Sequence, residues 1–170
     1  VDCPTIGADK QGDLIGVWID GRDEDRGSAS AGLYAAVLPP GGKAFGKNVR
    51  VNSAKAAACA CCFPSVAADD SGRLWVAFRG EQDDVREIQL FATSDRGATF
   101  KGGPVSADHW KMQGCPMAGP ALAVAPDGKT VALAWRFKDK MRAALSRDGG
   151  KKFADFDLAI AQHPDYAEAW

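Results

Sequence analysis

Short apolar runs separated by turn residues form the main pattern along the chain. Ser65–Ala68 and Leu74–Phe78 flank an Asp-Asp-Ser-Gly segment, and a further run follows at Ile88–Ala92. Runs of this length with turn chemistry between them are typical of antiparallel strands in a meander. The same pattern predicts strands at Leu33–Val37, Ala121–Ala125, Val131–Arg136 and Met141–Leu145. We therefore expect an all-β chain.

The pattern repeats along the chain. Pro4, Pro64 and Pro120 each open an apolar run, and each is followed at similar offsets by a glycine and then by an aromatic residue of a second run. Roughly 60 residues per repeat is enough for the four short strands of one propeller blade. The sequence predicts three four-stranded blades forming a single propeller segment, 1–170, with repeats at about 1–58, 59–114 and 115–170.

A turn motif closes the second and third repeats. Both copies fit Ser/Thr-x-Asp-x-Gly-x-x-Phe, and their shared positions are Asp95, Gly97, Phe100, Asp148, Gly150 and Phe153. An Asp in a turn accepts backbone N–H bonds, a Gly allows positive φ, and the aromatic ring packs between layers. In the first repeat, Gly42 and Phe45 keep the spacing while the Asp is lost.

This motif resembles the Asp box of the sialidase-like (BNR-repeat) β-propellers. The segments Cys59–Ser65 and His109–Pro116 also resemble a pair of signatures in a bacterial, cysteine-rich subgroup of that family. The resemblance implies that the boxes lie on outer turns between the third and fourth strands of a blade, away from any active centre. It also implies a ring of six blades, so this chain would be half of a ring. A second copy, another propeller-forming chain or missing sequence would complete it.

The amino-acid composition limits the classes of partner that we expect the protein to bind. Of the residues, 46% are hydrophobic and 25% charged, with a net charge of −1. We expect an ordinary globular protein without a nucleic-acid partner, because no basic stripe is present. No apolar run is long enough to span a membrane. The resemblance and the cysteines favour a periplasmic or extracellular location.

The cysteines carry the most specific chemistry. Each lies within a few residues before a repeat proline: Cys3, Cys59, Cys61, Cys62 and Cys115. Because the first strand of each propeller blade is innermost, we expect these thiols to gather near one mouth of the central channel.

Three interpretations of the cysteines remain open. Cys59 or one of its neighbours pairs with Cys115 in a disulfide that ties two blades together, and the odd count leaves at least one thiol free. Alternatively, the thiolates bind a soft metal such as copper or zinc. In the third, they are small buried apolar side chains. The candidate metal ligands are Cys59, Cys61, Cys62, Cys115, Met117 and His109.

The resemblance also makes sialidase activity a hypothesis to be considered. Family sialidases bind the substrate carboxylate with three arginines, and here Arg22, Arg79 and Arg136 follow the aromatic residues of the second runs. Arginine forks suit carboxylates, although pairing with loop carboxylates is the alternative interpretation. The Arg-Ile-Pro motif of sialidases is absent, and no nucleophile is well placed. The sequence predicts a non-catalytic binding or assembly module with a cysteine-lined mouth. The alternative is an exo-sialidase-type glycosidase that binds acidic carbohydrate.

Overall fold

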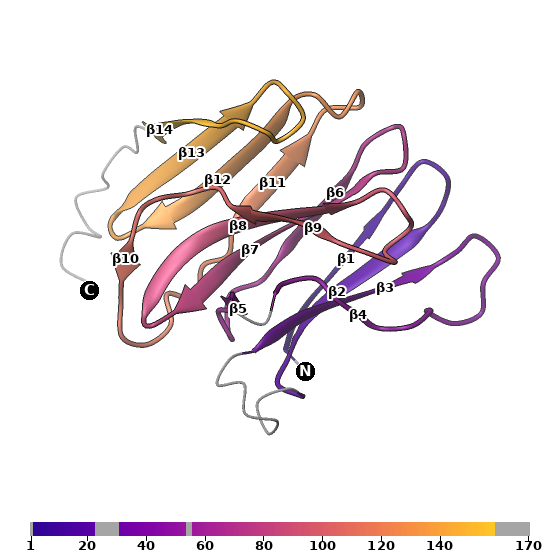
Figure 1. Cartoon of the computed structure of the whole chain (residues 1–170), viewed down its shortest axis with the longest axis horizontal. Coiled ribbons are helices and arrows are strands. Elements are labelled where there is room, and N and C mark those ends of the chain that lie inside the picture. The colour runs from indigo at the N-terminus through magenta and orange to yellow at the C-terminus, as the bar shows by residue number, and fades with distance from the viewer. Residues whose placement is uncertain (1, 23–30, 54–55, 159–170) are drawn as a thin grey trace, which may run out of the picture.

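The computed structural model describes residues 2–22, 31–53 and 56–158. Within these ranges every regular element is a β-strand, and the strands form three antiparallel sheets in chain order (Figure 1). Within the same ranges, no helix is long and apolar enough to cross a membrane. Sheet one contains β1 (Asp2–Ala8), β2 (Leu14–Asp20), β3 (Gly32–Leu38) and β4 (Val49–Arg50). The predicted all-β class is confirmed.

Sheet two is built on two long central strands, β7 (Leu74–Gln82) and β8 (Val85–Thr93). Two short strands pair in succession along the free edge of each. Beside β7 lie β5 (Ala57–Ala58) and β6 (Ser65–Ala68), and beside β8 lie β9 (Lys101–Pro104) and β10 (Trp110–Lys111). Sheet three contains β11 (Ala121–Val124), β12 (Val131–Phe137), β13 (Lys140–Ser146) and β14 (Ala154–Leu158).

The hairpin of sheet two extends further than its apolar pattern predicts. β7 continues past Phe78 to Gln82, although Arg79 and Glu81 are charged. The turn explains this, because Asp83 and Asp84 have φ values of 52° and 65°. A two-residue turn with positive φ at both positions matches the twist of paired strands and prolongs their pairing.

The core consists of two apolar layers between the sheets. Val76 and Phe78 of β7 pack in the layer shared with sheet one, while Trp75 and Ala77 pack in the layer shared with sheet three. This alternation follows from the two-residue period of a strand. β6 lies beside both β1 and β11, so the first strands of the three repeats adjoin. The sheets therefore stack as consecutive propeller blades do.

The predicted Asp turns lie where the resemblance implies, between β8 and β9 and between β13 and β14. Asp95 accepts hydrogen bonds from the Thr99 amide (2.9 Å) and from the Thr93 hydroxyl (2.6 Å). Gly97 has a φ of 81°. The Asp148 turn repeats this geometry, with bonds from the Lys151 and Lys152 amides, a φ of 79° at Gly150 and Phe153 packed against the core.

Candidate functional site

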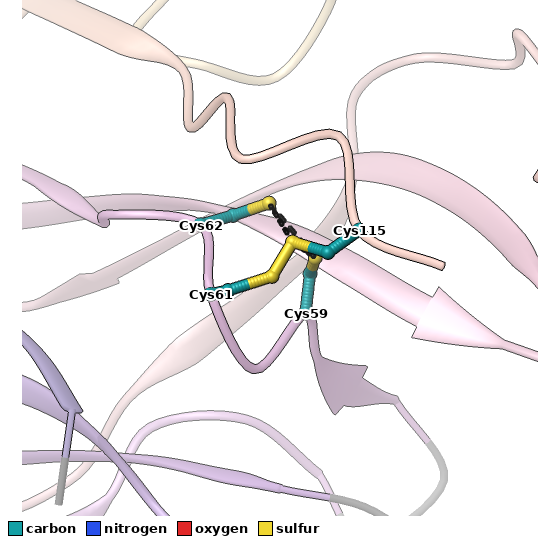
Figure 2. Close-up of side chains that lie close together, drawn as sticks. All are labelled: Cys59, Cys61, Cys62 and Cys115. Atoms are coloured by element: carbon teal, nitrogen blue, oxygen red, sulfur yellow. Dashed lines mark hydrogen bonds between the residues drawn. A yellow bond between two sulfur atoms is a disulfide. The ribbon is translucent and has the colours of Figure 1, made fainter. Parts of the chain in front are cut away.

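Two crossover segments meet at the end of β7 and bring four cysteines together. Cys59, Cys61 and Cys62 lie in the turn between β5 and β6, and Cys115 lies between β10 and β11 (Figure 2). Their sulfur atoms all lie within 4.8 Å of one another. Cys61 and Cys115 form a disulfide with a Cα–Cα distance of 6.5 Å. The predicted link between the second and third repeats is therefore present, and Cys61 is the partner of Cys115.

The other sulfur atoms complete a compact group. The Cys59 and Cys62 Sγ atoms are 2.8 Å apart, and they lie 3.7 Å and 3.9 Å from the Cys115 Sγ atom. Cys59 and Cys62 are buried, whereas Cys61 and Cys115 are half-buried. The group is thus largely enclosed but partly accessible to solvent.

Local backbone bonds fix this arrangement. The Cys59 amide donates to the Arg79 carbonyl (2.8 Å), and the Cys62 amide donates to the Cys59 carbonyl (3.2 Å), which closes the turn. On the second segment, Gly119 packs so tightly that a Cβ there would lie 1.7 Å from the Phe63 carbonyl oxygen. Only glycine allows the two crossovers to approach this closely.

Two buried arginines adjoin the sulfur group. Arg79 is 1% exposed and Arg86 is 2% exposed. Arg79 donates to the carbonyls of Ala118 and Arg136, each at 2.8 Å. Arg86 donates to the Gly114 carbonyl (2.7 Å), but its Nε and Nη1 atoms are buried without a hydrogen-bond partner. Burying cations is costly unless negative charge lies close by; here Glu81 Oε1 lies 3.3 Å from Arg86 Nη2, and the nearby thiols are a second source of negative charge.

The electrostatic coupling between these groups is visible in their pKa values. The hydrogen bond from the Cys62 thiol lowers the pKa of Cys59 to about 7, with further help from the Cys61 amide and the Arg86 charge. The same bond, together with burial, raises the pKa of Cys62. Burial lowers the pKa of Arg79, and the charges of Cys62 and Cys59 oppose that shift. This pair of thiols therefore holds one negative charge more readily than two isolated thiols would.

The remaining predicted ligands lie outside the group. His109 is largely exposed and its Nδ1 lies 3.1 Å from Glu87 Oε1. Met117 is 78% exposed, and it contacts the group through its amide, 3.3 Å from Cys115 Sγ. Cys3 packs in the core layer between sheets one and two. Four of the five predicted thiols are thus brought together.

The three candidate arginines have different surroundings. Arg79 is buried with its guanidinium directed at backbone carbonyls, as described above. Arg136 Nε donates to the Lys138 carbonyl (2.7 Å). Arg22 donates to the Asp20 carboxylate, and its guanidinium lies 4.3 Å from the centre of the Tyr34 ring. Arg79 and Arg136 are joined through a backbone carbonyl, and Arg22 lies just after β2 of sheet one.

Sequence reasoning missed the role of Arg86 and the contacts of the β9–β11 crossover. The Asp108 carboxylate accepts a bond from Trp135 Nε1 (2.7 Å) and pairs with Arg142. Glu87 accepts bonds from the Ser106 hydroxyl (2.6 Å) and the His109 amide (2.7 Å). In the sequence, charged residues in a predicted loop indicate exposure to solvent, so these buried contacts could not be predicted. These contacts hold the segment that carries Cys115 against sheets two and three.

No family model matches the chain, and no curated protein matches it. Among solved structures, a protein of unknown function from Dyadobacter fermentans aligns with a TM-score of 0.63 at 19% identity, over 95% of this chain and 51% of that one. The α-L-arabinanase of Penicillium chrysogenum aligns with a TM-score of 0.65 at 14% identity, over 96% and 50%. NanB sialidase from Streptococcus pneumoniae aligns with a TM-score of 0.52 at 17% identity, over 80% and 20%.

These similarities, with the three stacked sheets, define the chain as a segment of a β-propeller. Likeness at such low identity concerns the fold alone. The chain spans about half or less of each of these matched chains. Three sheets that cover half of a larger chain agree with the predicted half-ring.

Proposed function

We propose that this protein is a non-catalytic propeller module that binds one soft metal ion, Cu(I) or Zn(II), through Cys59, Cys61, Cys62 and Cys115. The observation that carries the proposal is the convergence of four sulfur atoms within 4.8 Å from two separate crossovers. Thiolates select these metals over Mg²⁺ or Ca²⁺.

The sulfur spacing supports a tetrahedral site. Four sulfur atoms at about 2.3 Å from a central zinc ion lie about 3.8 Å from one another. The distances from Cys115 Sγ to Cys59 Sγ and to Cys62 Sγ are 3.7 Å and 3.9 Å. A tetrathiolate site also requires the Cys59–Cys62 and Cys61–Cys115 pairs to separate, and all four sulfur atoms already lie within 4.8 Å of one another.

The buried cations support it as well. A divalent ion bound by four thiolates carries a double negative charge. Arg79 and Arg86 are both nearly inaccessible to solvent, and Arg86 has two buried N–H-bearing atoms without a partner. Their positive charges would stabilise an anionic metal–thiolate centre, in addition to the ion pair that Arg86 makes with Glu81 (3.3 Å).

Binding by all four residues requires reduction of the Cys61–Cys115 disulfide. Two electrons and two protons convert it to two thiols, and a small thiol reductant supplies them while it becomes a disulfide itself. The metal then displaces the thiol protons into solvent. The oxidised protein keeps only Cys59 and Cys62 of this group as free thiols. Metal occupancy is therefore coupled to the redox state of the surroundings.

Anaerobic metal titration tests the proposal. Reduced protein is loaded with Cu(I) or with Zn(II), desalted and assayed for bound metal. We expect close to one zinc per chain, or a fixed copper stoichiometry, lost in Cys59→Ser and retained in Cys3→Ser, whose thiol lies outside the group. Loss of metal from the wild-type protein on desalting would overturn the proposal.

A second candidate function is binding or hydrolysis of an acidic carbohydrate. It is favoured by the sialidase among the structural matches, and Arg22, Arg79 and Arg136 are its candidate carboxylate ligands. Hydrolysis of a fluorogenic sialoside that is lost in Arg136→Ala would support it. The engagement of Arg79 with backbone carbonyls instead favours a structural role for that residue.

We also infer a periplasmic or extracellular location, because a cross-link between repeats forms most readily in an oxidising compartment. In that compartment the disulfide form predominates, so metal binding by all four cysteines there depends on a supply of thiol reductant. Completion of the ring by a second copy or by another propeller-forming chain is a separate question, which does not depend on the metal.

A further inference from the structure

Sheet one presents an apolar face that none of the described residues covers. Sheet one lies at one end of the stack of sheets (Figure 1). Ile15, Val17 and Ile19 of β2 point into the core toward sheet two, so Trp18 lies on the opposite face. There Ile6 is 62% exposed and Phe45 is 44% exposed. These residues line a groove of about 480 Å³ that also includes Pro4 and Ala36.

The equivalent positions of the other two repeats indicate which kind of surface this face contacts. Ile6, Trp18 and Phe45 occupy the positions that Val66, Phe78 and Phe100 occupy in the second repeat. Those three pack into the core between sheets one and two. In the third repeat the corresponding positions are Leu122, Trp135 and Phe153, which pack against sheet two. In both covered cases, the neighbour is the preceding sheet of the propeller.

The opposite end of the stack presents a complementary surface. Val131, Leu133 and Trp135 pack toward sheet two, so the alternate side chains of β12 point away from it. That outer face is apolar apart from Arg136: Ala121 and Ala123 of β11 are exposed, Ala132 and Ala134 of β12 are half-buried, and the register places Leu145, Met141 and Leu158 on the same face. Both end faces therefore leave apolar side chains exposed, Ile6 and Phe45 on sheet one and Leu158 on sheet three, and packing one face on the other would bury them.

We propose that two copies of this chain associate head to tail, with sheet three of each copy packed on sheet one of the other. The two faces lie at opposite ends of one chain, so the contact joins different surfaces and closes only if the rotation brings the ends together. Two half-rings of three sheets close into a six-sheet ring with two equivalent contacts. The Dyadobacter protein and the arabinanase match the chain over about half of their own length, which fits a half-ring.

This inference goes beyond metal binding and does not depend on it. A chain that dimerises but binds no metal would refute only the metal proposal, and the reverse result would refute only this one.

Sedimentation of the full chain over a range of concentrations tests the inference. The chain has a mass of 17.9 kDa, and the wild type should sediment as two chains. Ile6→Glu alters the sheet-one face and Ala123→Glu alters the sheet-three face. Each places a carboxylate in both apolar contacts, so each should raise the dimer dissociation constant at least about 100-fold. Gln82→Glu adds the same charge at an exposed site outside both faces and should leave association unchanged.

Three outcomes would overturn the inference. In the first, wild-type protein is monomeric at every concentration, so that the faces require some other chain. In the second, Ala123→Glu dimerises normally, so that sheet one pairs with itself. In the third, the wild type forms open oligomers larger than a dimer. An equal mixture of Ile6→Glu and Ala123→Glu provides the positive test, because the mixed dimer keeps one unaltered contact and should associate more strongly than either variant alone. Circular dichroism confirms that each variant is folded.

Discussion

Gly150 of sheet three lies directly against the indole ring of Trp75 in sheet two. A Cβ placed on Gly150 would stand 2.9 Å from Trp75 Cζ3. Gly97 of sheet two has the same relationship with Val37 of sheet one, again at 2.9 Å. The glycine of each Asp turn therefore allows a sheet to approach the one before it, and the turn contributes to stacking as well as to its own hairpin.

Replacing Gly150 with alanine should destabilise the fold through two effects. The residue has a φ of 79°, and its new methyl group would meet Trp75. We expect a loss of about 3 kcal/mol in the free energy of unfolding, measured by urea denaturation. Gly41→Ala is the matched control, because Gly41 also has positive φ but a Cβ added there would meet no atom within 4 Å. It should cost about 1 kcal/mol. Equal losses in the free energy of unfolding in the two variants would show that the Trp75 side chain moves aside without an energetic penalty.

Asp95 should make stability sensitive to acid. Hydrogen bonds from the Thr93 hydroxyl and the Thr99 side chain and amide lower the pKa of Asp95 to about 2. The unfolded chain has a value near 4, so this carboxylate stabilises the fold above about pH 4, and the contribution is lost as the pH falls toward 2. Asp95→Asn should therefore lose stability at pH 5 but little at pH 2, in urea denaturation at both values. Ser94→Ala, at the exposed neighbouring position, should show no such dependence. An equal loss at both pH values would contradict this account.

Arg79 should matter far more to stability than Arg136. Arg79→Ala leaves the Ala118 and Arg136 carbonyls without their buried donor, and we expect a loss of about 3 kcal/mol. Arg136→Ala removes a single bond to the Lys138 carbonyl in an exposed setting and should cost less than about 1 kcal/mol. Urea denaturation at neutral pH measures both. Similar small losses would indicate that Arg79 is not held as the structure describes.

Thiol counting should resolve the oxidation state of the cysteines. Cys3, Cys59 and Cys62 are free and Cys61 is paired with Cys115. Denatured, non-reduced protein isolated without metal should react with maleimide at three cysteines, and reduced protein at all five. A single reactive cysteine before reduction would mean that Cys59 and Cys62 are linked as well, which would contradict the described pairing.

The fold was largely predictable because its determinants are local. The short apolar run Ser65–Ala68, next to turn residues, predicted β6 with its observed bounds, and the proline and glycine spacing predicted the repeat. The Asp turns were predictable since the side chain of Asp95 bonds to residues within a few positions of it.

The site was only partly predictable, because its contacts join distant parts of the chain. The position of Cys115 before Pro120 placed it near Cys59 through the repeat alone. The spacing of the repeat does not predict the burial of Arg86. That burial depends on a hydrogen bond to the Gly114 carbonyl, 28 residues away, and on the long β7–β8 hairpin, whose length is hard to predict because the residues near Arg86 are polar. The choice of Cys61 over Cys59 or Cys62 as the partner of Cys115 likewise depends on turn geometry that spacing does not define.

The proposed metal centre is tested most directly by X-ray absorption at the zinc edge of reduced, zinc-loaded protein. The account predicts a first shell of sulfur atoms alone, about four at about 2.3 Å, which shrinks in Cys62→Ser. A shell of oxygen or nitrogen atoms at about 2.0–2.1 Å would contradict it, because the zinc would then be bound away from the cysteines.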